Sequence, residues 1–151
     1  MVPGPIGAVP GTFIEAGKRW SLVLNRNQNL LGKCMVVLNR EEADVTRLTE
    51  AEWSDLRRYL RRVTAALDSL FQPDTYNFAF LMNEDRWVHL HVVPRYEGPR
   101  EWAGERFEDP HFGSLFGTEQ RLLDADARLR LSRAVAAALE RERLGRTLPT
   151  E

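Results

Sequence analysis

The sequence has one cysteine, no long apolar run and almost no net charge. Cys34 cannot form an intrachain disulfide, which excludes the disulfide-stapled secreted scaffolds, and we expect it to be a small core residue. No stretch approaches the roughly 18 consecutive apolar residues of a transmembrane helix, and the first residues lack the basic start and apolar core of a signal peptide. We therefore expect a cytoplasmic protein without a membrane partner.

The 21 Lys and Arg residues against 22 Asp and Glu give a formal net charge of −1. This balance provides no overall positive field that would hold a nucleic acid polymer, so an anionic ligand must bind at a local site. The 151 residues, of which 43% are hydrophobic and 28% charged, fit one globular domain. We expect 1–12, rich in Pro and Gly, to be a loose arm, 13–97 to be the core, and 98–151 to be a loop and helix extension of the same domain.

Apolar patterning predicts an α+β fold. β-rich runs bounded by turn residues predict strands over 20–25, 34–38, 76–82 and 87–93. Thr49-Glu-Ala-Glu52 is a capping box, and apolar residues three and four apart follow it, which predicts a helix over 49–71 that Pro73 terminates. A last helix is predicted over 126–144, closed by Gly145.

Side chains on the two faces of the 49–71 helix are predicted to differ. The apolar stripe that we expect to be buried comprises Trp53, Leu56, Leu60, Val63, Leu67 and Leu70. The arginines that fall on the opposite side, and that we expect to be a solvated surface, are Arg57, Arg58, Arg61 and Arg62.

Two of the three histidines, His89 and His91, lie one residue apart in the predicted strand 87–93. Because side chains alternate along a strand, both imidazoles share one face, roughly 6.6 Å apart at the backbone. Arg95 is expected to add a cation to that face. Imidazole exchanges protons and attacks electrophiles near neutral pH, so the pair is a candidate catalytic site.

Two other interpretations of the pair stay open. Both histidines could be half-buried strand residues with satisfied hydrogen bonds. The His-x-His spacing also suits a zinc or iron ion, with a third ligand such as His111 supplied from elsewhere.

The segment Trp87-Val-His-Leu-His-Val-Val-Pro-Arg95 resembles the active-site strand of the histidine triad (HIT) superfamily. Upstream, Asn25 precedes Lys33, the second residue of a Gly-Lys pair, by eight residues. This segment, 24–38, is similar to another family segment. The resemblance covers roughly 13–97. It implies an antiparallel sheet of about five strands with a packed central helix and a C-terminal helix, a small-molecule nucleotide ligand, no cofactor or metal, and a homodimer.

The resemblance also implies roles for individual residues. His89 would be the nucleophile that forms a covalent nucleotidyl-histidine, and a protonated His91 would donate to phosphate oxygens or the leaving group. Asn25 would contact the ribose hydroxyls and Asn83 the phosphate chain. Trp20 and Leu22 lie on the strand that would wall the nucleobase pocket. The implied function is a nucleotide hydrolase or nucleotidyl transferase acting at the α-phosphate of a nucleoside polyphosphate or phosphoramidate; the alternative is a non-catalytic nucleotide-binding module.

Two positions depart from the family pattern. Trp87 replaces the first histidine of the triad, whose contribution in the family is chiefly its backbone carbonyl, which a tryptophan also has. Lys33 replaces the histidine of the Gly-His pair. A lysine there could hold phosphate, but it could shuttle a proton at neutral pH only if burial lowered its pKa.

Overall fold

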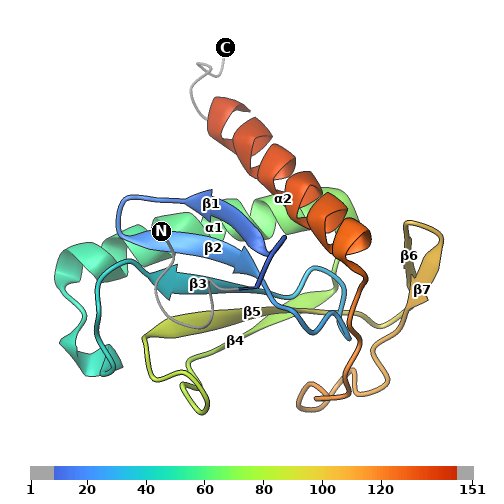
Figure 1. The fold of residues 1–151 in the computed structure, drawn as a ribbon, viewed down its shortest axis with the longest axis horizontal. Helices are drawn as coiled ribbons and strands as arrows, with labels where there is room; N and C mark the ends of the chain where they lie inside the picture. Colours follow the sequence, from blue (N-terminus) through green and yellow to red (C-terminus); the bar gives the residue numbers. More distant parts are fainter. Residues whose placement is uncertain (1–8, 146–151) are drawn as a thin grey trace.

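The computed structural model describes residues 9–145, which form a five-stranded antiparallel sheet covered on one side by two helices (Figure 1). The strand order is β1-β2-β3-β5-β4, with bounds Phe13–Ala16, Trp20–Leu24, Cys34–Leu38, Thr75–Ala79 and His89–Arg95 for β1 to β5. The 3₁₀ turn η2, Val45–Arg47, precedes helix α1, Glu50–Phe71. The second helix is α2, Ala125–Gly145. This confirms the predicted α+β fold.

The two faces of the sheet have different surroundings. On one face, Leu22 of β2, Val36 of β3 and Leu90 of β5 belong to a buried cluster that includes Leu56 and Val63 of α1. The opposite face carries the small cluster of Val23 and Val37, with Met35 and Trp87 packed against it. The face that α1 leaves uncovered is therefore the one available for a site.

The buried cluster corrects one expectation and confirms another. Trp20 and Leu22 are core residues on the α1 side, and the Trp20 indole donates to the Glu52 carbonyl at 3.0 Å, so neither walls a pocket. Cys34 is fully buried in the same core, as predicted. Residues of α2, including Leu131 and Val135, pack into this cluster too.

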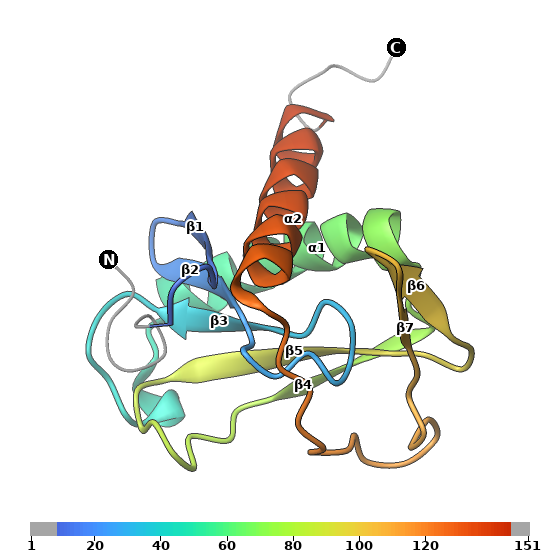
Figure 2. The ribbon, with the colours of Figure 1, turned by 45° about the vertical axis from the view of Figure 1, so that its right-hand side comes forward.

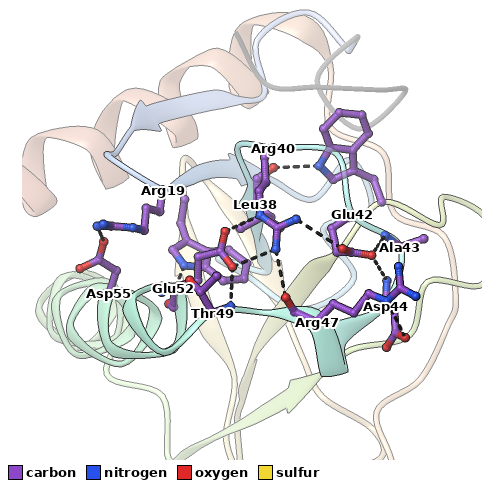
Figure 3. Close-up of polar contacts among 12 residues, drawn as sticks. Arg19, Leu38, Arg40, Glu42, Ala43, Asp44, Arg47, Thr49, Glu52 and Asp55 are labelled. Atoms are coloured by element: carbon purple, nitrogen blue, oxygen red, sulfur yellow. Dashed lines mark hydrogen bonds and ion pairs between the residues drawn. The ribbon is translucent and has the colours of Figure 1, made fainter.

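The start of α1 matches the predicted capping box. The Thr49 hydroxyl accepts from the Glu52 amide at 3.2 Å, and the Glu52 carboxylate accepts from the Thr49 amide at 2.8 Å. Arg40 holds the same carboxylate from the β3 side, with Nε and Nη2 at 2.6 and 3.0 Å, and also reaches the Glu42 carboxylate and the Arg47 carbonyl (Figure 3). One network thus fixes the helix start to the end of the sheet.

The helix faces were predicted less well. Trp53 is 40% exposed and lies edge-on to Phe80 rather than in the core. Arg62 was expected in solvent, but its guanidinium pairs with both carboxylate oxygens of Glu15 and donates to the Leu139 carbonyl. The contacts of Arg62 arise because β1 and α2 pack beside α1, which the helical periodicity alone could not include.

Some strand boundaries also differ. β4 and β5 pair antiparallel as predicted, but β4 ends at Ala79 and β5 begins at His89. The connection over 80–88 is therefore longer than the predicted turn at 83–86. β1 was not predicted, nor was the small hairpin of β6, Arg100–Trp102, and β7, Glu105–Phe107.

The expected loose arm is wrong for residues 9–12, and residues 1–8 lie outside the described residues. Thr12 is buried, the Gly11 carbonyl accepts from the Ser132 hydroxyl at 2.6 Å, and the Pro10 carbonyl accepts from the Arg128 guanidinium at 2.9 Å. At the other end, α2 matches the predicted helix closely; residues 146–151 are also outside the described part. None of the described helices is long and apolar enough to cross a membrane.

The Glu52 network predicts a pH-dependent stability. Hydrogen bonds from Arg40 lower the pKa of Glu52 to about 2, whereas an unfolded Glu titrates near its ordinary value. The carboxylate therefore stabilises the fold at pH values above about 4.5, and this contribution is lost as the pH falls towards 2. We expect Glu52→Gln to lower the free energy of unfolding by about 1–3 kcal/mol at pH 7 in urea denaturation, and by progressively less on acidification.

The matched control is Glu50→Gln, because Glu50 lies in the same first turn of α1 but is exposed. Its unfolding curve should follow that of the wild type throughout the acid range. Parallel pH profiles for Glu52→Gln and wild type would contradict the role given to this carboxylate.

Candidate active site

A cavity of about 570 Å³ opens on the sheet face opposite α1. Its lining comes from the residues before β1, the β2–β3 loop, the inner strands, the connection over 80–88 and the segment between β7 and α2. Figure 2 shows that last segment crossing the sheet on the side away from α1 before it enters α2. The side chains that line it and could contact a ligand include Asn25, Arg26, Lys33, Asn83, Glu84, Asp85, His89, His91, Phe116, Thr118 and Gln120. Its volume falls in the range typical of small-molecule sites.

His89 and His91 both line this cavity. Their ring centroids are 4.9 Å apart with an interplanar angle of 64°, and His89 is the more deeply buried. The residues between and beside them, Val88, Leu90 and Val92, belong to the core on the other face. The alternation along β5 therefore places both imidazoles in one cavity.

The backbone of Trp87 fixes the orientation of His89. The Trp87 carbonyl oxygen lies 2.7 Å from His89 Nδ1. Because a carbonyl oxygen can only accept, Nδ1 carries the hydrogen, and in a neutral ring Nε2 then keeps a lone pair. The Trp87 side chain turns away and donates from its indole to the Leu38 carbonyl at 2.9 Å, so Trp87 serves the site through its main chain.

Lys33 lines the cavity with its ammonium, and the residue as a whole is only 6% exposed. Nζ donates to Asn29 Oδ1 at 2.6 Å, and the Lys33 carbonyl accepts from the Asn25 amide and from the buried Gln28 side chain at 2.9 and 2.7 Å. Burial lowers the pKa of Lys33 to about 8, partly opposed by the Glu119 carboxylate. Burial therefore brings the pKa of Lys33 into the range that proton exchange near neutral pH requires.

His91 differs from the expectation of a protonated imidazole. Burial, followed by the charges of His89 and Lys33, lowers its pKa to about 4. The His91 ring is therefore neutral at pH 7 in this structure. A neutral imidazole still donates one hydrogen bond, but the cation at this place is Lys33.

The other predicted site residues have different positions. Asn25 and Asn83 both line the cavity, and Asn25 Oδ1 accepts from the Asn27 amide at 2.9 Å. Arg95 does not offer a free cation, contrary to expectation. Its side chain is 3% exposed, and its donors reach Asp109, Asn77 and the backbone carbonyls at positions 111 and 114.

Sequence patterns missed the cavity wall formed by 116–120, which comprises Phe116, Gly117, Thr118 and Gln120. Asparagine side chains of the β2–β3 loop hold this wall: Asn29 Nδ2 donates to the Gly117 carbonyl at 2.9 Å, and Asn27 Nδ2 to the Glu119 carbonyl at 3.0 Å. The run of amides at 25–29 was a signal, since such side chains commonly bind backbone groups. It did not indicate which segment they would bind.

The family model of the HIT domain matches residues 7–98, more than half of the chain. The chain belongs to the HIT domain family. The wall at 116–120 lies outside the matched residues. No curated protein sequence matches the chain.

Solved structures similar to this HIT domain share its fold. A histidine triad protein from Bradyrhizobium japonicum is 21% identical with a TM-score of 0.63, covering 86% of this chain and 88% of that one. One from Marinobacter aquaeolei VT8 is 18% identical with a TM-score of 0.66, covering 85% and 88%. A hypothetical histidine triad nucleotide-binding protein from Sulfolobus tokodaii is 12% identical with a TM-score of 0.65, covering 86% and 84%.

His111 does not join the histidine pair of this HIT domain. It lies at a second, smaller cavity, where Nε2 is 2.6 Å from Glu119 Oε1. Across residues 9–145, no three His, Cys, Asp or Glu side chains gather as a set that could hold a metal ion. The suggestion that His111 completes a metal site with His89 and His91 is therefore wrong.

Gly32, directly before Lys33, gives a prediction about how the β2–β3 loop is held. It has φ of +84°, and a Cβ there would lie 3.0 Å from the Phe71 ring. We expect Gly32→Ala to lower the free energy of unfolding by about 2–4 kcal/mol, because a left-handed backbone and crowding in the core each add a cost. Urea denaturation measures this change.

Gly104 is the matched control. It has a similar φ of +79°, but a Cβ there would meet nothing within 4 Å. Gly104→Ala should therefore show only the backbone cost of about 1–2 kcal/mol. Equal losses for the two variants would mean that contact with Phe71 contributes nothing.

Proposed function

We propose that this HIT domain cleaves a nucleoside polyphosphate or phosphoramidate at the α-phosphate, as a hydrolase or nucleotidyl transferase that forms a covalent bond to His89. The observation that carries the proposal is the contact between His89 Nδ1 and the Trp87 carbonyl inside a ligand-sized cavity. It leaves Nε2 as the nucleophilic nitrogen. Family membership and the nucleotide-binding description of the Sulfolobus tokodaii protein support a nucleotide as the ligand.

The reaction proceeds in two steps. The Nε2 lone pair of His89 attacks the α-phosphorus, and the bond from phosphorus to the leaving group breaks, so the leaving group departs with the electron pair and takes up a proton. Water then attacks the phosphorus of the nucleotidyl-histidine and loses a proton, while the phosphorus–nitrogen bond breaks and restores neutral His89. An acceptor other than water gives transfer in place of hydrolysis.

The surrounding groups stabilise these steps. Attack makes the His89 ring positive, and the Trp87 carbonyl stabilises that charge by accepting from Nδ1. The neutral His91 donates a hydrogen bond to a phosphate oxygen. Asn25 contacts the ribose hydroxyls and Asn83 the phosphate chain, each from the cavity wall. A homodimer in the cytoplasm is also part of the proposal.

The test is an assay of dinucleoside polyphosphates and adenosine phosphoramidate, with and without a chelator. We expect wild-type turnover in both conditions and a loss of at least about 1,000-fold in His89→Ala, because the nucleophile is gone. Glu50→Gln is the control, since Glu50 is exposed on α1 and outside the cavity, and its turnover should be close to wild type. Mass spectrometry after an alkaline quench should detect a nucleotidyl adduct on wild type only.

Three outcomes would contradict the proposal. A nucleotide that raises the melting temperature of the wild type without any product would identify a non-catalytic binding module. Turnover that a chelator abolishes would favour metal chemistry. Turnover that survives in His89→Ala would exclude His89 as the nucleophile.

A further inference from the structure

The strand register places Lys33 next to His91 in the cavity. β3 pairs with β5 such that Cys34 lies opposite Val92 and Met35 opposite His91. Lys33 precedes β3 by one residue and so projects on the same face as Met35, as a diagonal neighbour of His91, about 7–8 Å away at the backbone. Both side chains line the same cavity.

The Lys33 ammonium is available for chemistry. In the described part of the chain, no carboxylate lies within ion-pair distance of Nζ, whose acceptor is the neutral Asn29 amide oxygen. The charged or titratable groups that face it are Glu119, whose field raises the pKa of Lys33, the two imidazoles of His89 and His91, and the cavity residues Arg26, Glu84 and Asp85. Burial outweighs the opposing field of the Glu119 carboxylate, so the pKa of Lys33 is about 8.

The basic residue at position 33 is a lysine in a chain whose basic residues are nearly all arginines. Only two of the 21 basic residues are lysines, Lys18 and Lys33, and all others are arginines. Where this fold needs a permanent buried cation, in the ion pair with Asp109, it has Arg95. An ammonium can lose its proton in a protein, whereas a guanidinium cannot.

We infer that Lys33 is the acid–base group of the proposed reaction, protonating the leaving group in the first step and deprotonating water in the second. When the bond from phosphorus to the leaving group breaks, the leaving oxygen or nitrogen takes a proton from the Lys33 ammonium. The resulting neutral amine accepts the proton of the attacking water as the phosphorus–nitrogen bond breaks, which returns Lys33 to its starting state. The inference rests on the proposed function and extends it.

The rate of cleavage should depend on Lys33 when the leaving group needs a proton, and it should be insensitive to Lys33 when the leaving group does not. An alkylamine must be protonated to leave a nucleoside phosphoramidate, whereas p-nitrophenolate leaves adenosine 5′-(p-nitrophenyl) phosphate without a proton. Among substrates with the same nucleoside, Lys33 would therefore favour those with a basic leaving group, such as an amine or alkoxide.

The experiment compares Lys33→Arg and Lys33→Met with wild type on these two substrates. We expect both variants to lose about 100-fold or more in kcat/KM on the alkylamine substrate. On the p-nitrophenyl ester they should still release a fast burst of p-nitrophenolate, within about 10-fold of the wild-type burst rate, and then stall with nucleotide on His89. Wild-type kcat/KM on the alkylamine substrate should fall above about pH 8, and this limb should be absent in Lys33→Arg.

Controls separate the possible failures. Lys18→Arg, at an exposed lysine, should match wild type on both substrates, and circular dichroism should show that each Lys33 variant is folded. If Lys33→Arg keeps wild-type rates and the same pH profile, Lys33 contributes only charge and this inference is wrong, while the proposed function stands. If the folded wild type cleaves neither substrate, the proposed function and this inference fail together.

Discussion

The antiparallel register between β3 and β5 is the constraint on which the site depends. It sets Met35 opposite His91 and Val37 opposite His89. A shift by one residue would turn both imidazoles into the core against α1 and place Leu90 in the cavity. The register is held from the opposite face, where Leu90 and its neighbours are buried. Apolar packing on the α1 side therefore positions the polar groups on the other side.

Burial sets the charges of Lys33 and His91. Removal from water disfavours the charged forms of Lys33 and His91, so the imidazole is neutral at pH 7 and the ammonium titrates near 8. The poorly solvated ammonium of Lys33 attracts a phosphate more strongly than the same charge would in water. Arg95 cannot add to it, because its charge is neutralised by Asp109 in an ion pair that holds the cavity-forming segment after β7 to the sheet.

Local patterns predicted much of the fold. The capping box at Thr49, the alternation around His89 and the strands over 20–38 depend on neighbours within a few residues, so a sequence is sufficient to identify them. Predictions failed where distant segments meet. Arg95 and Arg62 were expected at a surface. Asp109 instead neutralises Arg95 in the interior, and Glu15 neutralises Arg62 at a partly buried position.

By itself, the sequence determined that His89 and His91 share one face, because alternation is a property of an extended backbone. That strand, together with the segment 24–38, also carried the resemblance to the HIT family, whose model matches residues 7–98. Only the tertiary structure decided how these groups are charged and what encloses them. Hydrogen bonds between residues up to 92 positions apart hold the wall at 116–120 at the site. The pKa of Lys33 depends on the burial that such contacts produce. Desolvation is set by everything that surrounds a group in space, and adjacent residues in the chain provide only part of it.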